Sequence, residues 1–249
     1  MDRPPYDLIV SLGCWCAPAA NIRRRFGITE AMPFDWWVIP YDGLMRVLSE
    51  RFSGLLQAKN LEMFPFPNQP RHSVRCKYYD LLHHHDFERD EDQAVKRTFL
   101  TQLPEVQKKT RFIVERFFER VRDRRVLFLR DWLKEDHWFP HYGEISHPDH
   151  STQFGYARNL YTLLDEQFRP REFDLFVLSN IDAQPSFLAE KGAIEFCSLG
   201  ARADNTYFWD ANYDKLFDER GVLLAQDSMR AIRPGACDGQ RASRRTLKW

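Results

Sequence analysis

Four short apolar runs constrain the fold of this chain more than any other feature of the sequence. They span residues 7–12, 125–130, 173–179 and 193–198. Each run is almost continuously hydrophobic and does not alternate with polar residues, which is typical of parallel strands covered on both faces. Patterns of one-sided amphipathic helices lie between them, over residues 17–26, 42–56, 105–121 and 151–168. We therefore predict an α/β fold: an open, mostly parallel, Rossmann-like sheet with helices on both faces.

Length and local composition predict how the chain is divided. A chain of 249 residues suits a single α/β domain, which we place over residues 1–234. Residues 60–90 begin with a stretch rich in Pro and aromatic residues, and we expect them to form a cap or insertion over the sheet. Residues 235–249 are polar and basic, which indicates a flexible tail.

Charge and cysteine content predict the environment of the protein. Lys and Arg total 36, as do Asp and Glu, so we expect no nucleic-acid partner and no acidic membrane surface as a partner. The apolar runs are far shorter than the roughly 20 residues that span a bilayer, and the first residues lack the pattern of a signal peptide. Five cysteines form no disulfide framework. These features predict a cytoplasmic protein.

Polar residues follow the predicted strands. Ser11 ends the first strand, Arg130 and Asp131 follow the second, and Asn180 follows the third. Ligands of open parallel sheets bind beyond the carboxyl ends of the strands, so adjacent parallel strands would bring these groups to one edge. The alternative is that Ser, Asp and Asn end strands because they form turns and helix caps.

A cysteine and a histidine are the candidate catalytic groups. Cys16 is expected at the first turn of the helix over residues 17–26, where free backbone N–H groups and the helix dipole lower a thiol pKa. His83, His84 and His85 precede Asp86, so an imidazole and a carboxylate are available as base and orienting group. The same N–H groups could hold an oxyanion.

Four motifs resemble a known family. They are Ser11-Leu12-Gly13 with Cys16 and Ala19, Pro33-Phe34-Asp35-Trp36, Tyr79 with His85-Asp86-Phe87, and Leu127-Phe128-Leu129-Arg130. In order and spacing they are similar to the bacterial family of unknown function labelled "putative papain-like cysteine peptidases". The resemblance implies that Cys16, rather than Cys14, is the nucleophile and that His85 is the histidine. It also implies an alternative fold, papain-like α+β. The family often has Asn before its cysteine and this chain has Trp15, so an oxyanion role for that side chain is lost.

Several site residues have two readings. Asp35 either lines a pocket together with Trp36 or forms a turn and cap. Arg130 either binds an anionic or carboxylate substrate or forms a salt bridge with Asp131 or Asp35. Cys14 and Cys16 could be a metal or redox pair, but a structural zinc site takes four ligands and the chain has no second paired motif, so we predict no metal.

We predict a cysteine-dependent hydrolase or acyltransferase without a cofactor, acting on a peptide or a small molecule. Cys16 attacks a carbonyl group, His85 is the general base, and Asp86 orients the imidazole, with Asp131 or Asn180 as alternatives. Ser11, Gly13, Asp35, Trp36, Arg130 and Asn180 are the predicted substrate-binding residues.

Two other functions compete with this reading. One is a hydrolase or transferase on an α/β sheet that acts on a glycan, ester or nucleotide-linked substrate, with a histidine from residues 137–150. The other is a binding module without catalysis.

Overall fold

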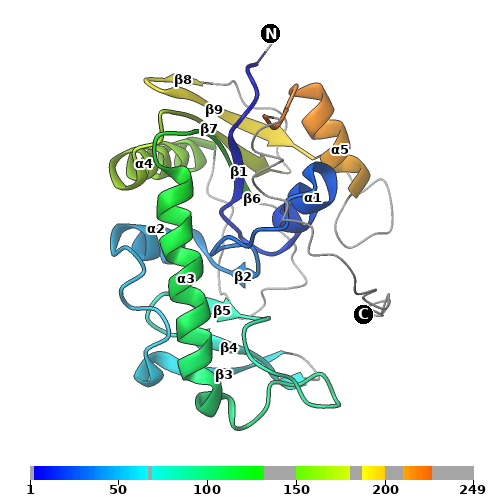
Figure 1. The fold of residues 1–249 in the computed structure, drawn as a ribbon, viewed down its shortest axis with the longest axis vertical. Helices are drawn as coiled ribbons and strands as arrows, with labels where there is room; N and C mark the ends of the chain where they lie inside the picture. The colour runs from blue at the N-terminus through cyan, green and yellow to red at the C-terminus, as the bar shows by residue number, and fades with distance from the viewer. Residues whose placement is uncertain (1–2, 67–68, 132–149, 180–186, 200–209, 226–249) are drawn as a thin grey trace, which may run out of the picture.

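The computed structural model describes residues 3–66, 69–131, 150–179, 187–199 and 210–225. The described chain forms two β-sheets, one above the other in Figure 1, with the long helix α3 (Leu103–Val121) running alongside both. The upper sheet is mostly parallel and the lower sheet is antiparallel. None of the described helices is both long and apolar enough to cross a membrane.

The mostly parallel sheet has the strand order β1-β6-β7-β9-β8. Its strands are β1 (Leu8–Ser11), β6 (Arg125–Asp131), β7 (Glu172–Ser179), β9 (Gly192–Ser198) and the short antiparallel edge strand β8 (Phe187–Ala189). The first four coincide with the four apolar runs, so the prediction of a parallel sheet is confirmed. The described parallel strands follow one another in chain order without a reversal. The Rossmann-like form of the prediction is therefore not confirmed, because a doubly wound sheet reverses its order at a switch point.

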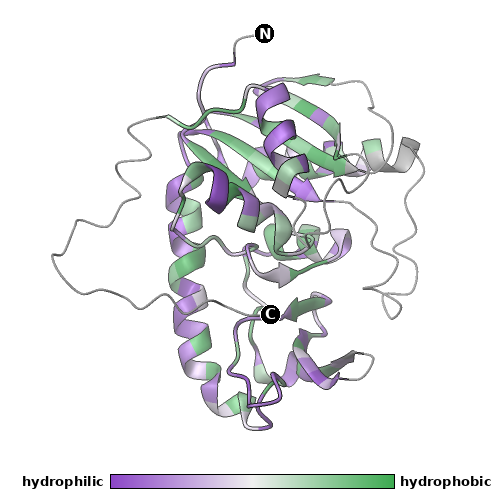
Figure 2. Cartoon of the chain, turned by 90° about the vertical axis from the view of Figure 1, so that its right-hand side faces the viewer, coloured by the Kyte–Doolittle hydropathy of each residue, from purple (hydrophilic) through white to green (hydrophobic). Residues whose placement is uncertain are grey.

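Helices cover both faces of this sheet because alternate strand residues point in opposite directions. Val126 and Phe128 of β6 lie in one hydrophobic cluster with residues of α2 (Tyr41–Ser49), α3 and α4 (His150–Phe168). Leu127 and Leu129 lie in the other cluster with residues of α1 (Ala17–Phe26) and α5 (Asp210–Glu219). Figure 2 shows the matching colours: the strands are largely hydrophobic, whereas α3 alternates between hydrophobic and hydrophilic residues.

One predicted helix is shorter than its pattern. The apolar spacing predicted a helix over residues 42–56, but α2 ends at Ser49. Arg51, Phe52 and Leu56 all have positive φ angles, of 51°, 64° and 54°. Residues with left-handed backbone angles interrupt an α-helix. The apolar residues beyond Ser49 therefore pack into the core from turns instead of from a helix.

The antiparallel sheet lies in and next to the region predicted to be a cap or insertion. Its order is β2-β5-β4-β3, formed by β2 (Trp37–Val38), β3 (Leu61–Phe66), β4 (Gln69–Cys76) and β5 (Leu81–His83). The 3₁₀ helices η1 (Ala58–Asn60) and η2 (Phe99–Gln102) precede β3 and α3. The tail predicted at residues 235–249 lies outside the described residues.

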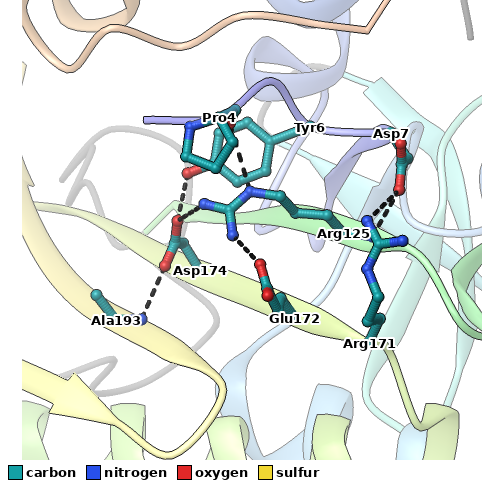
Figure 3. Close-up of polar contacts among 8 residues, drawn as sticks. All are labelled: Pro4, Tyr6, Asp7, Arg125, Arg171, Glu172, Asp174 and Ala193. Atoms are coloured by element: carbon teal, nitrogen blue, oxygen red, sulfur yellow. Dashed lines mark hydrogen bonds and ion pairs between the residues drawn. The ribbon is translucent and has the colours of Figure 1, made fainter. Parts of the chain in front are cut away.

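A polar network fixes the amino ends of the parallel strands (Figure 3). The buried carboxylate of Asp174 on β7 accepts hydrogen bonds from the Tyr6 hydroxyl and, at 2.8 Å, from the backbone N–H of Ala193. Arg125 on β6 pairs with Glu172 at 2.5 Å and with Asp174 at 3.4 Å. This network joins the residues before β1 to β6, β7 and β9 at the edge opposite the predicted site.

We expect Asp174→Ala to lower the free energy of unfolding by about 3 kcal/mol, because the Tyr6 hydroxyl and a backbone N–H lose their acceptor in a buried place. Tyr6→Phe should cost only about 1 kcal/mol, since Asp174 keeps its other donors. Urea denaturation measures both. The exposed pair of Arg24 and Asp214 is the control, and Asp214→Ala should cost less than about 1 kcal/mol. Equal losses for Asp174→Ala and Asp214→Ala would contradict the assignment.

Candidate functional site

The turn after β1 is built around Gly13. Its φ of 76° lies in the left-handed region, and a Cβ placed there would come within 3.1 Å of the Ile39 side chain. Ser11, which is buried, accepts the Gly13 N–H with its Oγ at 3.2 Å. The Gly13 carbonyl in turn accepts the Asp131 N–H at 3.0 Å, so the turn is fastened to the end of β6. Ser11 and Gly13 were both predicted to bind substrate. In the structure they shape the turn that carries Cys14 and Cys16.

Arg130 is buried beside this turn. One guanidinium nitrogen donates to the Leu12 carbonyl at 2.8 Å and the other to the Ile39 carbonyl at 2.9 Å. Only 1 % of the residue is exposed, and burial lowers the pKa of its guanidinium. Neither of the salt bridges considered from the sequence is found. Arg130 instead joins the turn after β1 to the chain entering α2.

Asp131 points to the opposite face of the sheet, as the residue after Arg130 in a strand must. Its carboxylate is fully buried, and Oδ2 accepts hydrogen bonds from the Trp15 indole at 2.5 Å and from the Tyr213 hydroxyl at 3.5 Å. Tyr213 comes from α5 and is itself buried. Asp131 therefore lies on the same side of the sheet as α1 and the residue next to Cys16.

The carboxyl ends of the parallel strands meet at one edge, as the sequence predicted. Ser11 pairs in register with Leu129 of β6, Asp131 pairs with Leu178 of β7, and Ser179 pairs with Ser198 of β9. Asn180 and residues 137–149 lie outside the described residues. Their predicted roles stay predictions.

Cys16 is the N-cap residue of α1, and Pro18 occupies the first turn of the helix. The residue is partly exposed. Burial nevertheless raises the pKa of its thiol to about 11, and the hydrogen bond from its own backbone N–H opposes this only in part. The expected lowering of the thiol pKa is thus not found in this geometry. In the described part of the chain, no hydrogen bond joins this thiol to an imidazole.

Cys14 faces a different environment from Cys16. It is buried, and burial raises the pKa of its thiol to about 11, although the positive charge of Arg130 acts the other way. A buried thiol with a raised pKa packs as a small hydrophobic residue.

The carboxylate of Asp86 is hydrogen-bonded to His83. Its Oδ2 lies 2.8 Å from His83 Nδ1 and 2.7 Å from the Trp37 indole nitrogen that donates to it. Burial raises the pKa of Asp86, but the hydrogen bond and charge of His83 outweigh this, and the pKa lies below its usual value. His83 is fully buried, and among the described residues its Nε2 has no hydrogen-bond partner. The pair His83–Asp86 forms across the turn after β5, with the imidazole buried and the carboxylate partly buried.

His85 lies at the surface, where its ring contacts Trp36 edge-on with the centroids 5.5 Å apart. The guanidinium of Arg23, on α1, lies 5.5 Å from the centroid of the Trp36 ring. Arg23 is seven residues beyond Cys16, which corresponds to about 10 Å along a helix. These contacts place His85 beside the second half of α1.

Asp35, predicted either to line a pocket or to form a turn, has the contacts of a turn residue. Its Oδ2 accepts the Met32 N–H at 2.9 Å and pairs with Arg23 at 2.8 Å. Burial raises the pKa of this carboxyl even though Arg23 opposes the shift. Asp35 thereby fastens the Pro33–Trp36 turn to α1, and this turn positions Trp36.

Two further histidines gather on the antiparallel sheet. Ser73 Oγ lies 2.9 Å from Nδ1 of both His72 and His84, and these two rings have centroids 4.4 Å apart. Burial, together with Arg89 and neighbouring imidazoles, lowers the pKa of His72 to about 4 and that of His84 to about 2. Within the described ranges, no three His, Cys, Asp or Glu side chains come together so as to hold a metal ion.

Comparison with known proteins identifies the family. Residues 7–145, more than half of the chain, match the family described as "Putative papain-like cysteine peptidase (DUF1796)". The chain belongs to this family, as its motifs indicated. Searches of curated proteins and of solved structures found no match.

Trp15 and Tyr213 are the site residues that sequence reasoning missed. Trp15 was considered only for a role that it lacks, and no site role was predicted for Tyr213. The alternation of β6 could have predicted that Asp131 faces away from Arg130. Nothing local could predict that Tyr213 reaches Asp131, which lies 82 residues earlier in the chain.

Arg130→Met tests whether Arg130 is structural. We expect a loss of about 3 kcal/mol in the free energy of unfolding, because two buried carbonyls lose a charged donor. Arg130→Lys should be destabilising too, since one ammonium does not reproduce the fork of a guanidinium. Chemical denaturation gives both values. A folded Arg130→Met protein of unchanged stability would support the predicted substrate-binding role instead.

The histidine cluster predicts loss of stability in mild acid. His72 and His84 have lowered pKa values in the folded state, so below about pH 6.5 the unfolded chain binds more protons than the folded one. Stability is therefore full above pH 6.5 and falls as the pH drops toward 4, by up to about 1.4 kcal/mol per pH unit for each imidazole. Thermal melts at pH 7.5 and pH 5 check this. His84→Gln should make the melting temperature depend less on pH. The same pH dependence in the variant and the wild type would refute the prediction.

Proposed function

We propose that this protein is a cysteine-dependent hydrolase whose nucleophile is Cys16. The observation that carries the proposal is the place of this thiol: it is partly exposed at the start of α1, beyond the carboxyl end of β1, in a chain whose family is described as "Putative papain-like cysteine peptidase (DUF1796)". Ligands of parallel sheets bind at this edge. The substrate is a carbonyl compound, either a peptide or a smaller amide or ester.

The proposed reaction follows acyl transfer through a thioester. The Cys16 thiol gives its proton to the general base, and its sulfur bonds to the carbonyl carbon. The tetrahedral intermediate collapses as the leaving group takes that proton, which yields a thioester. Water, deprotonated by the same base, then attacks the thioester, and the acid product and the thiol are released.

The proposed general base is His85. Its surface position keeps it accessible, and its lowered pKa, caused by partial burial and by Arg89, keeps the imidazole neutral and able to accept a proton. For this role the imidazole has to reach the start of α1, where Cys16 is the N-cap residue. Asp131 and Asp86 are the two candidate supporting carboxylates, and each already accepts hydrogen bonds, Asp131 from Trp15 and Tyr213 and Asp86 from His83 and Trp37.

Backbone donors near Cys16 are the proposed oxyanion hole. The N–H groups of a first helical turn have no partner within the helix. Pro18 has no N–H, which leaves those of Cys16, Ala17 and Ala19 as the candidates. Ser11, Gly13 and Arg130 support the turn in this proposal, and Trp36, whose ring contacts His85, is the proposed aromatic contact for substrate.

A second function is favoured by the raised thiol pKa. A thiol with a pKa of about 11 is almost entirely protonated at neutral pH and is a weak nucleophile. This favours a module that uses the same edge to bind a ligand without covalent chemistry.

Acylation by p-nitrophenyl acetate separates the two functions. For a hydrolase we expect a burst of nitrophenolate of about one equivalent per chain, with the acetyl group on the Cys16 peptide, because thioester formation precedes hydrolysis. Cys16→Ser should abolish the burst, and His85→Ala should slow it about 100-fold or more. Stopped-flow absorbance and peptide mass spectrometry measure both.

Matched variants control this experiment. Cys197→Ser removes a buried thiol on β9 and should leave the burst unchanged. His84→Gln removes the imidazole next to His85 and should slow the burst far less than His85→Ala does. Acetylation spread equally over several cysteines, or no burst at all, would favour the binding module.

A further inference from the structure

We propose that His83 and Trp37 are positioning residues for His85: together they hold the carboxylate of Asp86, and this fixes the turn that presents the neighbouring imidazole at the surface. The inference rests on the proposed role of His85 as the general base. It gives a function to two buried side chains, His83 and Trp37, that are not part of the proposed catalytic pair.

Strand pairing brings the two positioning residues together. Strands β2 and β5 are antiparallel neighbours, and Trp37 lies directly opposite His83 in their register. Opposite residues of an antiparallel pair point to the same face of the sheet. Their rings are 5.4 Å apart between centroids and are inclined at 77°. Only 3 % of Trp37 and none of His83 is exposed, so both side chains are held by the surrounding core.

Asp86 closes the turn after β5 onto this pair. One carboxylate oxygen, Oδ2, lies 2.7 Å from the Trp37 indole nitrogen and 2.8 Å from His83 Nδ1. Since an ionised carboxylate only accepts hydrogen bonds, both nitrogens are the donors. The other oxygen lies 3.8 Å from Nζ of Lys109 on α3. Two charge-assisted hydrogen bonds to one oxygen hold the side chain in place, and with it the backbone of residue 86.

His85 lies between two anchored residues. On one side, the His84 carbonyl accepts a hydrogen bond from the Arg89 guanidinium at 2.6 Å. On the other side, Asp86 is held by the buried pair. Of the three consecutive histidines, His83 is buried, His84 is partly buried and His85 is exposed. The turn therefore presents His85 to solvent while the residues before and after it are held in place.

Two consecutive tryptophans contact two consecutive residues of the turn. The Trp36 ring meets the His85 ring edge-on, with the centroids 5.5 Å apart, whereas the Trp37 indole holds Asp86. A displacement of Asp86 would therefore change where His85 lies relative to Trp36. The Trp36 ring also lies 5.5 Å from the guanidinium of Arg23 on α1. The position of the imidazole relative to this helix thus depends on the hydrogen bonds of Asp86.

NMR tests the position of His85 without any substrate. In protein with ¹³C-labelled histidine, the ring current of Trp36 shifts the imidazole resonances of His85, which are recorded at about pH 8, above the ordinary pKa of an imidazole. We expect Asp86→Ala to move these resonances toward their positions in Trp36→Leu, because the turn loses its anchor. Asp86→Asn should leave them near their wild-type positions, since one amide oxygen can accept both hydrogen bonds.

The acetyl burst at Cys16 tests whether this position matters for the reaction. We expect Asp86→Ala to slow the burst about tenfold or more, because a small misplacement of a catalytic group lowers the rate substantially. His83→Phe and Trp37→Phe each remove one donor and should act in the same direction. His83→Asn, whose amide nitrogen can replace Nδ1 as the donor, should keep the rate close to that of the wild type. In a His85→Ala background, Asp86→Ala should slow the burst no further, since it acts through that imidazole.

Asp174→Ala is the matched control, because it removes a buried carboxylate that also accepts from an aromatic side chain, in the parallel sheet. In the folded protein it should leave the His85 resonances and the burst rate unchanged. Unchanged His85 resonances in Asp86→Ala, or further slowing by Asp86→Ala in the His85→Ala background, would overturn the proposal. If Asp86→Ala does not fold, Trp37→Phe replaces it in both measurements and the same outcomes decide. A wild-type protein without a burst would count against the proposed hydrolase, whereas the resonances judge the position of His85 separately.

Discussion

The guanidinium of Arg130 is the contact on which the candidate site depends. It holds the carbonyls of Leu12 and Ile39, which belong to the turn after β1 and to the chain entering α2. Gly13 lies against this guanidinium with a positive φ, and a side chain there would meet Ile39. The direction in which α1 leaves β1, and with it the place of Cys16, follows from this arrangement. A buried cation that binds carbonyls rather than a carboxylate also explains why Arg130 has no acidic partner in the described chain.

The alternation of side chains at the end of β6 divides this edge of the sheet into two environments. Arg130 faces α2 and supports the turn, whereas Asp131 faces α1 and α5 and meets Trp15 and Tyr213. A single residue step therefore separates the structural cation from the carboxylate that holds Trp15. Trp15 connects Asp131 to the candidate nucleophile, because its indole is hydrogen-bonded to Asp131 and the residue directly precedes Cys16 in the chain.

The histidines show where sequence reasoning succeeded and where it did not. The motif with His85, Asp86 and Phe87 was recognised, but adjacency in sequence did not predict that Asp86 would bind His83. The reason is local geometry: His83 and Asp86 are brought together across the turn after β5, and Trp37 holds the same carboxylate oxygen. The thiol pKa was mispredicted for a related reason. The helix terminus was visible in the sequence, but the burial that outweighs it depends on the packing around Cys16.

The sequence by itself determined the four parallel strands, the helix that begins after Cys16, and the membership of the family. Strands buried on both faces need continuous apolar runs, and such runs can be read one residue at a time. Only the tertiary structure decided which polar groups pair at the carboxyl edge. Asp131 meets Tyr213 across 82 residues, and Arg130 meets Ile39 across 91, because distant segments are brought together by packing on the two faces of the sheet. No local pattern records those pairings, since each partner is chosen by the fold as a whole.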